Sequence, residues 1–339
     1  MPPRAMILGC AGEVLSREES DFMAEADPLG FILFSRNCAS PGQVGQLSAQ
    51  LGAAVGRDDA PILIDQEGGR VQRLGPPHWR AAPPAGLIAR LARQDLEAGL
   101  QAARLNARLI AGELVGLGIS VNCAPVLDIP TPGADPIIGD RAAGWDGPSA
   151  AALGRAACEG FLAGGILPVI KHIPGHGRGA VDSHKTLPRT AASFEELKES
   201  DFAPFRDLAD MPWAMTAHMA YEAIDEERPA TQSALVISEI IRGHMGFEGV
   251  LISDDLSMGA LSGSLGERAR MSLEAGCDLV LHCNGEMEEM REVAEQTPIL
   301  SETALARLSA GAARPGPVQP LEDGALKHLD GLLAEARAA

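Results

Sequence analysis

The sequence predicts a single (β/α)8 barrel, and two observations carry that prediction. Eight short, mostly apolar runs alternate with longer segments of helical character, as expected for parallel strands that are buried on both faces. Ionisable residues also lie at the ends of five consecutive runs or in the segments that follow them, and in a barrel the carboxyl ends of the strands meet at one mouth. The strand candidates are Ala5–Cys10, Gly30–Phe34, Pro61–Asp65, Ser120–Ala124, Pro168–His172, Trp213–His218, Gly249–Ser253 and Asp278–Cys283.

The segments between these runs have the length, small residues and Glu/Arg-rich faces of surface helices. Clear examples are Pro41–Gly56, Leu96–Leu117, Ser149–Gly164, Gln232–Met245 and Leu265–Ala275. An open, doubly wound sheet usually carries a Gly-rich phosphate loop after its first strand, and Cys10–Glu13 is not such a loop. No linker or internal repeat divides the chain. We therefore expect one barrel domain over residues 1–339, with a helical extension outside the barrel from about residue 311.

The composition of the chain excludes several classes of binding partner. The net charge is −18, from 28 basic and 46 acidic residues, so the chain should repel nucleic acids and anionic membrane surfaces. No apolar run approaches the roughly 20 residues that span a bilayer. The six cysteines form no CxxC pair, and four lie inside apolar runs, which favours reduced thiols. With no recognisable targeting segment, these features predict a cytoplasmic protein.

Ionisable groups gather where the predicted strands end. Asp65–Arg73 follows the third run, Arg141 lies beyond the fourth, Lys171–His172 ends the fifth, His218 the sixth and Asp254–Asp255 comes at the end of the seventh. A lone Asp after a strand is often only a helix cap. Side chains of this kind on five consecutive strands share one rim, however, and that face of a barrel carries function rather than stability. The rim is therefore the candidate site.

The segment after the fifth run is the richest in chemistry. It carries His176, Asp182 and His184, and three glycines at alternate positions are expected to make it pliable. Asp182 and His184 are two residues apart, so both side chains can face one site. A carboxylate beside an imidazole raises the pKa of the imidazole and fixes its tautomer, as a general acid near neutral pH requires. The alternative is that both residues only satisfy local backbone groups.

Two further positions leave roles open. Adjacent strand residues point to opposite sides, so one of Asp254 and Asp255 should face the mouth while the other caps a helix or braces a neighbour. The residues alone do not say which. Glu67 is a rival for the general acid. We favour a structural role for it, as a partner of Arg70 or Arg73, because a Glu locked to Arg stays ionised and donates protons poorly.

Four motifs taken together resemble those of family 3 glycoside hydrolases, in the bacterial β-N-acetylglucosaminidase branch of peptidoglycan recycling. They are DQEGGRVQR at 65–73, KHIPGHG at 171–177, DSH at 182–184 and SDDLSM at 253–258. The motifs occur in the family's order, and the resemblance extends from about Ala5 to Ala310. The combination of KHIPGHG with DSH is highly specific, and so is SDDLSM.

The resemblance implies a retaining exo-β-N-acetylglucosaminidase on a single catalytic barrel. It would remove terminal N-acetylglucosamine from (anhydro)muropeptides through a covalent glycosyl-Asp intermediate. Asp254 would be the nucleophile, His184 the proton donor and acceptor, and Asp182 the residue that orients and tunes His184. No cofactor or metal is implied, the partner is a small sugar substrate, and the oligomeric state stays open. The implied substrate-binding residues are Asp65, Arg73, Arg141, Lys171 and His172.

Other functions stay open on the sequence alone. A β-glucosidase or β-xylosidase would use the same nucleophile, and in a phosphorolytic variant the Asp182/His184 pair would admit phosphate where a second carboxylate would repel it. His172, His176, His184 and Asp254 could instead hold the metal of a barrel hydrolase, although their spacing matches no common zinc motif. A non-catalytic sugar-binding barrel is a third class, and the occupied catalytic positions argue against it.

Overall fold

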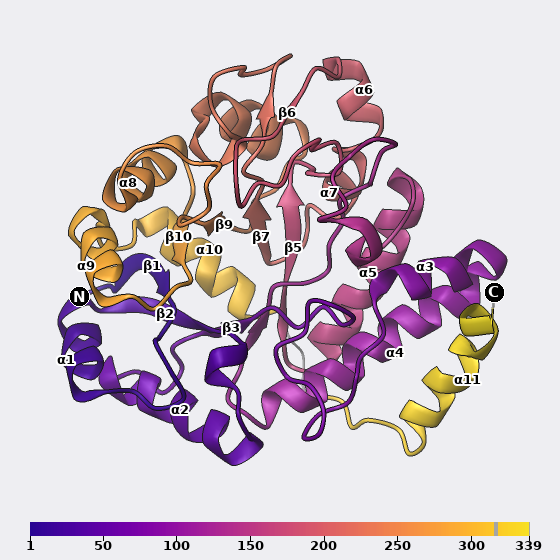
Figure 1. Cartoon of the computed structure of the whole chain (residues 1–339), viewed down its shortest axis with the longest axis horizontal. Coiled ribbons are helices and arrows are strands. Elements are labelled where there is room, and N and C mark those ends of the chain that lie inside the picture. The colour runs from indigo at the N-terminus through magenta and orange to yellow at the C-terminus, as the bar shows by residue number, and fades with distance from the viewer. Residues whose placement is uncertain (315–317, 339) are drawn as a thin grey trace.

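The computed structural model describes residues 1–314 and 318–338, and its centre is a closed barrel of parallel strands (Figure 1). β1 closes the barrel by pairing with both β2 and β10. Each strand overlaps one of the eight candidates, so the predicted fold class is confirmed. The strands are β1 (Arg4–Leu8), β2 (Pro28–Leu33), β3 (Ile62–Ile64), β4 (Val121–Asn122), β5 (Leu167–Ile173), β7 (Trp213–Thr216), β9 (Val250–Asp255) and β10 (Leu279–His282).

The strands are apolar on both sides because one side faces the interior of the barrel and the other faces the surrounding helices. In β2, Ile32 belongs to the interior cluster, whereas its neighbours Phe31 and Leu33 pack in the layer between strands and helices. The interior cluster also contains Leu63 from β3 and Val169 from β5. Full burial of one such side chain contributes about 1.5–3 kcal/mol to the free energy of unfolding. The barrel interior is thus filled by apolar side chains, and room for a ligand is left at the rim.

Helices surround the barrel (Figure 1), and many start at a residue that caps them. Ser16, Ser40 and Ser264 each accept a hydrogen bond from the backbone three residues on, which satisfies one of the free N–H groups of a first turn. The helices are α1 (Arg17–Ala26), α2 (Pro41–Ala54), α3 (Ala85–Gln94), α4 (Leu96–Val115), α5 (Gly147–Ala163), α6 (Phe194–Glu199), α7 (Ala203–Asp207), α8 (Leu265–Ala275), α9 (Met287–Gln296), α10 (Glu302–Ala312) and α11 (Ala325–Ala338).

Several short elements differ from the sequence expectation. The helix expected over Gln232–Met245 is split: η3 (Ala230–Gln232) is a 3-10 turn and η4 (Val236–His244) is wound as a π-helix. Two more 3-10 turns, η1 (Ser35–Asn37) and η2 (Gly139–Arg141), lie at the rim. A small parallel sheet of β6 (Arg189–Thr190) and β8 (Ala220–Tyr221) lies outside the barrel. Periodicity does not reveal elements of two or three residues.

The C-terminal helix α11 packs against α3 and α4, at the right of Figure 1. α10 runs to Ala312, so the segment between these two helices begins just beyond that residue. Residues 315–317 of the connector expected there, and residue 339, lie outside the described residues. Within 1–314 and 318–338, every helix is too short or too polar to cross a membrane.

Candidate active site

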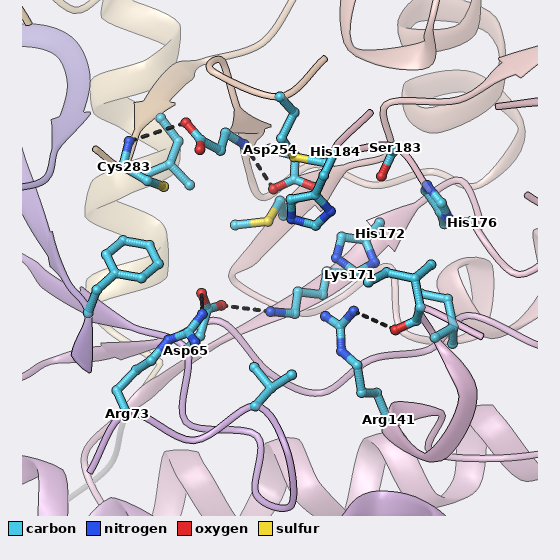
Figure 2. Close-up of a pocket in the computed structure, with 18 of the residues that line it drawn as sticks. Asp65, Arg73, Arg141, Lys171, His172, His176, Ser183, His184, Asp254 and Cys283 are labelled. Atoms are coloured by element: carbon cyan, nitrogen blue, oxygen red, sulfur yellow. Dashed lines mark hydrogen bonds and ion pairs between the residues drawn. The ribbon is translucent and has the colours of Figure 1, made fainter. Parts of the chain in front are cut away.

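A cavity of about 390 Å³ opens at the rim, within the size range of small-molecule sites. It is lined from the ends of β2, β3, β5, β7, β9 and β10 and from the loops that follow them (Figure 2). Asp182 does not line the cavity but lies two positions before His184 on the same loop and contacts its ring. The structure therefore brings together all but one of the predicted site residues as lining residues: Asp65, Arg73, Arg141, Lys171, His172, His184 and Asp254.

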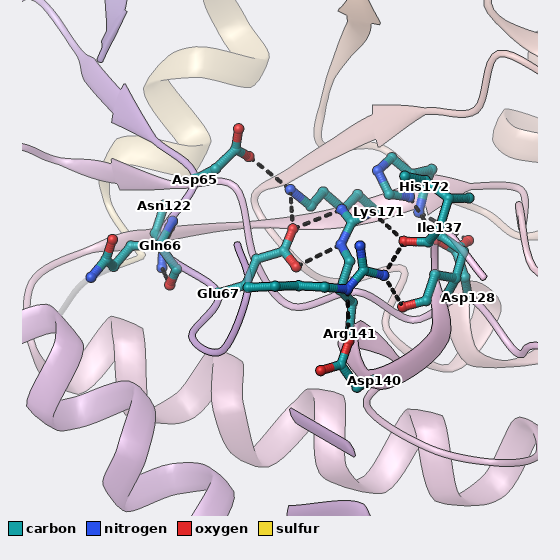
Figure 3. Close-up of polar contacts among 12 residues, drawn as sticks. Asp65, Gln66, Glu67, Asn122, Asp128, Ile137, Asp140, Arg141, Lys171 and His172 are labelled. Atoms are coloured by element: carbon teal, nitrogen blue, oxygen red, sulfur yellow. Dashed lines mark hydrogen bonds and ion pairs between the residues drawn. The ribbon is translucent and has the colours of Figure 1, made fainter. Parts of the chain in front are cut away.

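A chain of buried and half-buried ion pairs forms the floor of the cavity, which we define as Asp65, Glu67, Arg73, Arg141 and Lys171 (Figure 3; Arg73 is labelled in Figure 2). Lys171 Nζ lies 2.8 Å from Asp65 Oδ1 and 2.7 Å from Glu67 Oε1. Arg141 binds both oxygens of Glu67, at 2.8 and 2.9 Å, and Arg73 donates to Asp65 Oδ2 at 3.1 Å. Such two-pronged contacts fix the positions of the side chains as well as neutralising their charges.

The charges of the floor are locked in place. Burial would raise the pKa of Asp65, but the Lys171 and Arg73 cations outweigh it and hold that pKa below its usual value. Glu67 follows the same pattern, with Lys171 and Arg141 as the counter-charges. The paired carboxylates in turn raise the pKa of Lys171, against the effect of burial. These groups stay ionised at neutral pH, so they can bind sugar hydroxyls but are poor proton donors.

The expected partner of Glu67 was wrong. Glu67 binds Arg141 and Lys171 instead of Arg70 or Arg73. Arg70 reaches the carboxylate just before Arg141 in the sequence, and Arg73 is taken by the aspartate at the end of β3. The reason is position: the Glu67 side chain is buried within the floor, whereas the Arg70 side chain is exposed at the edge of the cavity. The structural role favoured for Glu67 thus has different partners.

His172 is oriented by a carboxylate that sequence reasoning did not single out. Asp128 Oδ2 lies 2.6 Å from His172 Nδ1, and Asp128 Oδ1 accepts the backbone N–H groups of His172 and His176. Asp128 is fully buried, and burial would raise its pKa, but His172 outweighs that effect and holds the pKa low. With Nδ1 facing Asp128, the other ring nitrogen of His172 is left for the cavity. The sequence feature that could have pointed to Asp128 is its position in the loop after the fourth predicted strand.

The two adjacent aspartates at the end of β9 have different surroundings. Both line the cavity, but the Asp255 carboxylate accepts hydrogen bonds from the backbone N–H and hydroxyl of Ser257, whereas that of Asp254 accepts one from the backbone N–H of Asp255. Burial would raise the pKa of Asp254, but His172 and His218 outweigh it and lower the pKa. His218 also donates from Nε2 to the Asp255 carbonyl at 3.0 Å, which braces this strand end. Asp254 is therefore an ionised carboxylate at the cavity wall.

His184 lies on the loop that follows β5, with its ring largely in solvent. Its Nδ1 is 2.9 Å from Asp182 Oδ1, which also accepts the His184 backbone N–H. Burial would raise the pKa of Asp182, but these hydrogen bonds outweigh it and lower the pKa. The loop is attached to the segment after Asp254 by two backbone bonds, from Gly259 N to the His184 carbonyl and from Ala260 N to the Ser183 carbonyl. Asp182 thus presents the other ring nitrogen of His184 outward.

The glycines of this loop do not simply make it pliable, as expected. A Cβ on Gly177 would collide with the backbone of Ile129, so this position is closed to any side chain. The segment next to β5 is therefore closely packed.

Phe34 also lines the cavity, and sequence reasoning did not select it. The guanidinium of Arg73 lies 5.0 Å from the centroid of its ring, and that of Arg36 lies 5.1 Å from it. Cation–π contacts of this length stabilise the arrangement of the arginines. A phenylalanine at the end of an apolar run carries no signal by itself, because it is read as part of the strand.

The residues proposed as metal ligands are not grouped like a metal centre. Among residues 1–314 and 318–338, no three His, Cys, Asp or Glu side chains are placed to share an ion. His172 is turned onto Asp128 and His184 onto Asp182, so each ring has one nitrogen engaged. The arrangement instead offers an ionised carboxylate, an imidazole–carboxylate pair and a charged floor around one cavity.

Comparison with known proteins identifies a family for the chain. The profile of the glycosyl hydrolase family 3 N-terminal domain matches residues 10–314. A protein named beta-hexosaminidase from Alkalilimnicola ehrlichii is 41% identical over 82% of this chain and 80% of its own length. Another of that name, from Methylococcus capsulatus, is 38% identical over 91% of this chain and 88% of its own length.

A solved structure is similar over almost the whole chain. NagZ from Neisseria gonorrhoeae, in complex with N-trifluoroacetyl-D-glucosamine, superposes with a TM-score of 0.88 at 32% identity and covers 99% of each chain. The family resemblance seen in the four motifs is thereby confirmed, and with it the expectation of a glycoside hydrolase. This chain belongs to glycosyl hydrolase family 3.

Proposed function

We propose that this protein is a retaining β-N-acetylhexosaminidase that releases terminal N-acetylglucosamine from peptidoglycan-derived fragments. One observation carries the proposal: an ionised Asp254 and the Asp182-supported His184 meet at the same cavity, above a floor of fixed charges. The substrate class is supported by the names of the relatives and by the glucosamine derivative bound to the Neisseria gonorrhoeae neighbour. The proposed site residues are those inferred from the sequence.

The reaction is a double displacement. Asp254 attacks the anomeric carbon while His184 gives its proton to the leaving oxygen, so the bond from that carbon to the aglycone breaks and a glycosyl-Asp254 ester forms. His184, now unprotonated, then takes a proton from water. The water oxygen bonds to the anomeric carbon, and Asp254 leaves as a carboxylate. Asp182 stabilises the imidazolium and holds the ring in the tautomer that the step needs.

The floor binds and orients the sugar. Asp65 keeps acceptor capacity for hydroxyl groups, while Lys171, Arg73 and Arg141 keep donors, because each pair uses only part of its hydrogen-bonding potential. Since the groups are already held by one another, little side-chain entropy is lost when the sugar binds. His172, fixed by Asp128, adds its free nitrogen. This preorganisation is what positions the anomeric carbon at Asp254.

The charge of the cavity fits an anionic aglycone. Four arginines and one lysine line it against three aspartates, although the chain as a whole carries a net charge of −18. Muropeptide fragments carry carboxylates, so a cationic mouth in an acidic protein favours their approach. We place the reaction in the cytoplasm, where the unpaired cysteines of the structure would stay reduced.

Turnover of chromogenic glycosides tests the proposal. We expect release from the N-acetyl-β-glucosaminide and much weaker release from the β-glucoside and β-xyloside; the reverse order would overturn the substrate assignment. No release above background would favour a sugar-binding protein. Activity that EDTA abolishes would favour the metal alternative, and a sugar 1-phosphate formed in phosphate buffer would show phosphorolysis.

Trapping tests the intermediate. A 2-fluoro or 5-fluoro sugar with a good leaving group slows release of the glycosyl-enzyme, so peptide mass spectrometry should find the label on Asp254. Label on Asp255 or Glu67, or no label at all, would overturn the nucleophile assignment.

A further inference from the structure

His176 is a buried imidazole that the proposed reaction does not use. Its side chain lines the cavity beside His172 and the His184 loop (Figure 2), yet only 4% of the residue is exposed. Neither ring nitrogen has a hydrogen-bond partner within the described residues. Burial lowers the pKa of the ring from 6.5 to about 4, so it is neutral at physiological pH, with one nitrogen as a donor and the other as an acceptor.

The loop itself covers the ring. A Cβ on Gly179 would lie 3.1 Å from His176 Cε1, which shows how closely the backbone of the loop at Gly179 passes over the imidazole. On the other side, the backbone N–H of His176 is fixed to Asp128 at 2.6 Å, and the His172 ring lies 5.9 Å away edge-on. Asp128 and His172 therefore fix the imidazole on one side, and residues of the loop cover it on the other side.

An imidazole in this position is costly. A buried donor or acceptor left without a partner destabilises a protein by about 1–3 kcal/mol. Native structures satisfy most such groups, and an exception inside a ligand cavity is a sign that a partner arrives in another state. The loop conformation seen here buries the ring without giving it a hydrogen bond. A small shift of the loop that supplied one would be favoured.

Ser183 is the partner best placed to supply it. The residue is buried and lines the same cavity, and its backbone carbonyl accepts the Ala260 N–H, which leaves the hydroxyl as the group that can turn to the ring. In the view of Figure 2 its side chain lies between the rings of His184 and His176. Ser183 also lies between Asp182 and His184 in the sequence, so anything that holds Ser183 holds the catalytic pair as well.

We propose that His176 is a positioning residue for the acid/base loop: its unprotonated ring nitrogen accepts the Ser183 hydroxyl when substrate is bound, and this bond sets His184 at the leaving oxygen. The inference rests on the proposed glycosidase function and deepens it. His176 does not touch the reacting atoms. It acts through Ser183, and the Ser183 hydroxyl is the group that transmits its effect.

The variants His176→Leu and Ser183→Ala test the proposal, with His176→Asn as the conservative variant. Loss of one hydrogen bond should lower kcat/KM for substrates with poor leaving groups by roughly three- to tenfold, because only these need the proton. Activated aryl glycosides should lose less. The double variant should be no slower than either single one, since both remove the same bond. His176→Asn should recover part of the loss.

A stability measurement separates positioning from a structural role. Because the ring has no hydrogen-bond partner among the described residues, His176→Leu should leave Tm unchanged or raise it. A structural histidine would give a lower Tm and equal losses on both substrate types, and that result would overturn the inference, as would additive losses in the double variant. His244→Leu and Ser48→Ala are matched controls, because each removes a side chain with an unpartnered atom outside the cavity.

The two proposals can fail separately. If the wild-type protein does not hydrolyse an N-acetylglucosaminide, the proposed function fails. If it does, and His176→Leu behaves like His244→Leu on both classes of leaving group, only the role of His176 fails.

Discussion

The floor of the cavity and the loop above it are built in opposite ways. In the floor, the side chains of Lys171 and Glu67 are only 3% and 6% exposed, and they pair with each other and with two neighbours, Asp65 and Arg141. In the loop, the His184 side chain is 61% exposed and has one side-chain partner, Asp182. Buried pairs fix geometry but are costly to break, whereas exposed pairs contribute little stability. Substitutions in the floor should therefore affect folding, and substitutions in the loop only the rate.

Substitution of the nucleophile should cause the largest loss of activity. Asp254 lies between the floor and the loop. Asp254→Asn should lower kcat/KM by about 10⁴-fold or more, because no covalent intermediate can form. Its side chain has no ion-pair partner within the described residues, so Tm should hold or rise. Steady-state kinetics and thermal unfolding measure the two. Asp255→Asn, which removes a bond to Ser257, should instead lower Tm; equal behaviour of the two variants would contradict the distinction between them.

His184→Ala is the sharpest test of the loop. For poor leaving groups kcat/KM should fall by about 10²–10⁴-fold, the usual contribution of a general acid, and for activated aryl glycosides far less. Stability should change by less than about 0.5 kcal/mol, because the ring is exposed. Lys185→Ala, one residue along the loop, is the control and should leave both unchanged. A loss of similar size on both substrate types would mean that His184 is not the acid.

Glu67→Gln is the corresponding test of the floor. It leaves the buried Lys171 and Arg141 with one carboxylate fewer, which should cost about 3–5 kcal/mol in the free energy of unfolding. Denaturant unfolding measures the loss. Glu159→Gln breaks an exposed pair with Arg104 and should cost no more than about 1 kcal/mol. If both variants lost the same amount, the contrast between buried and exposed pairs would not hold here.

The smallest effect is a pH dependence that comes from His176. Its pKa falls from 6.5 to about 4 on burial, so between these values only the unfolded chain binds the proton. Stability should therefore be lost as the pH falls through this window, by up to about 3 kcal/mol. His176→Leu should remove that part of the acid sensitivity. Unfolding curves at pH 7 and pH 4.5 measure it, and an unchanged difference between the two pH values would contradict the neutral, buried ring.

Sequence patterns predicted the barrel because both sides of each strand are apolar, and this gives short, dense runs such as Gly249–Ser253. Helices α1 and α9, which are not among the helical segments named from the sequence, are short and rich in charge, although their buried positions lie three or four residues apart. The π-winding of η4 has no sequence signal. Element type follows local composition, whereas these features depend on tertiary packing.

The site residues could be selected from the sequence because barrel topology collects strand ends at one rim. Their pairing could not. Glu67 is separated from its partner Arg141 by 74 positions, and nothing local distinguishes that partner from the nearer Arg70. The support of His172 by Asp128 was missed for the same reason. Which carboxylate of 254–255 is held by Ser257 depends on the direction of a strand end, and a sequence pattern leaves that direction open.

The two backbone bonds between the His184 loop and residues 259–260 have a consequence for how this enzyme can change in evolution. Backbone hydrogen bonds do not depend on which side chain a residue carries. Most point substitutions at the bonded positions therefore leave the attachment of the loop intact. Gly259 is the exception, because a Cβ there would lie 2.8 Å from the His184 carbonyl that its own N–H holds. Substitutions beside this attachment can therefore accumulate without releasing the loop, provided that Gly259 keeps no side chain.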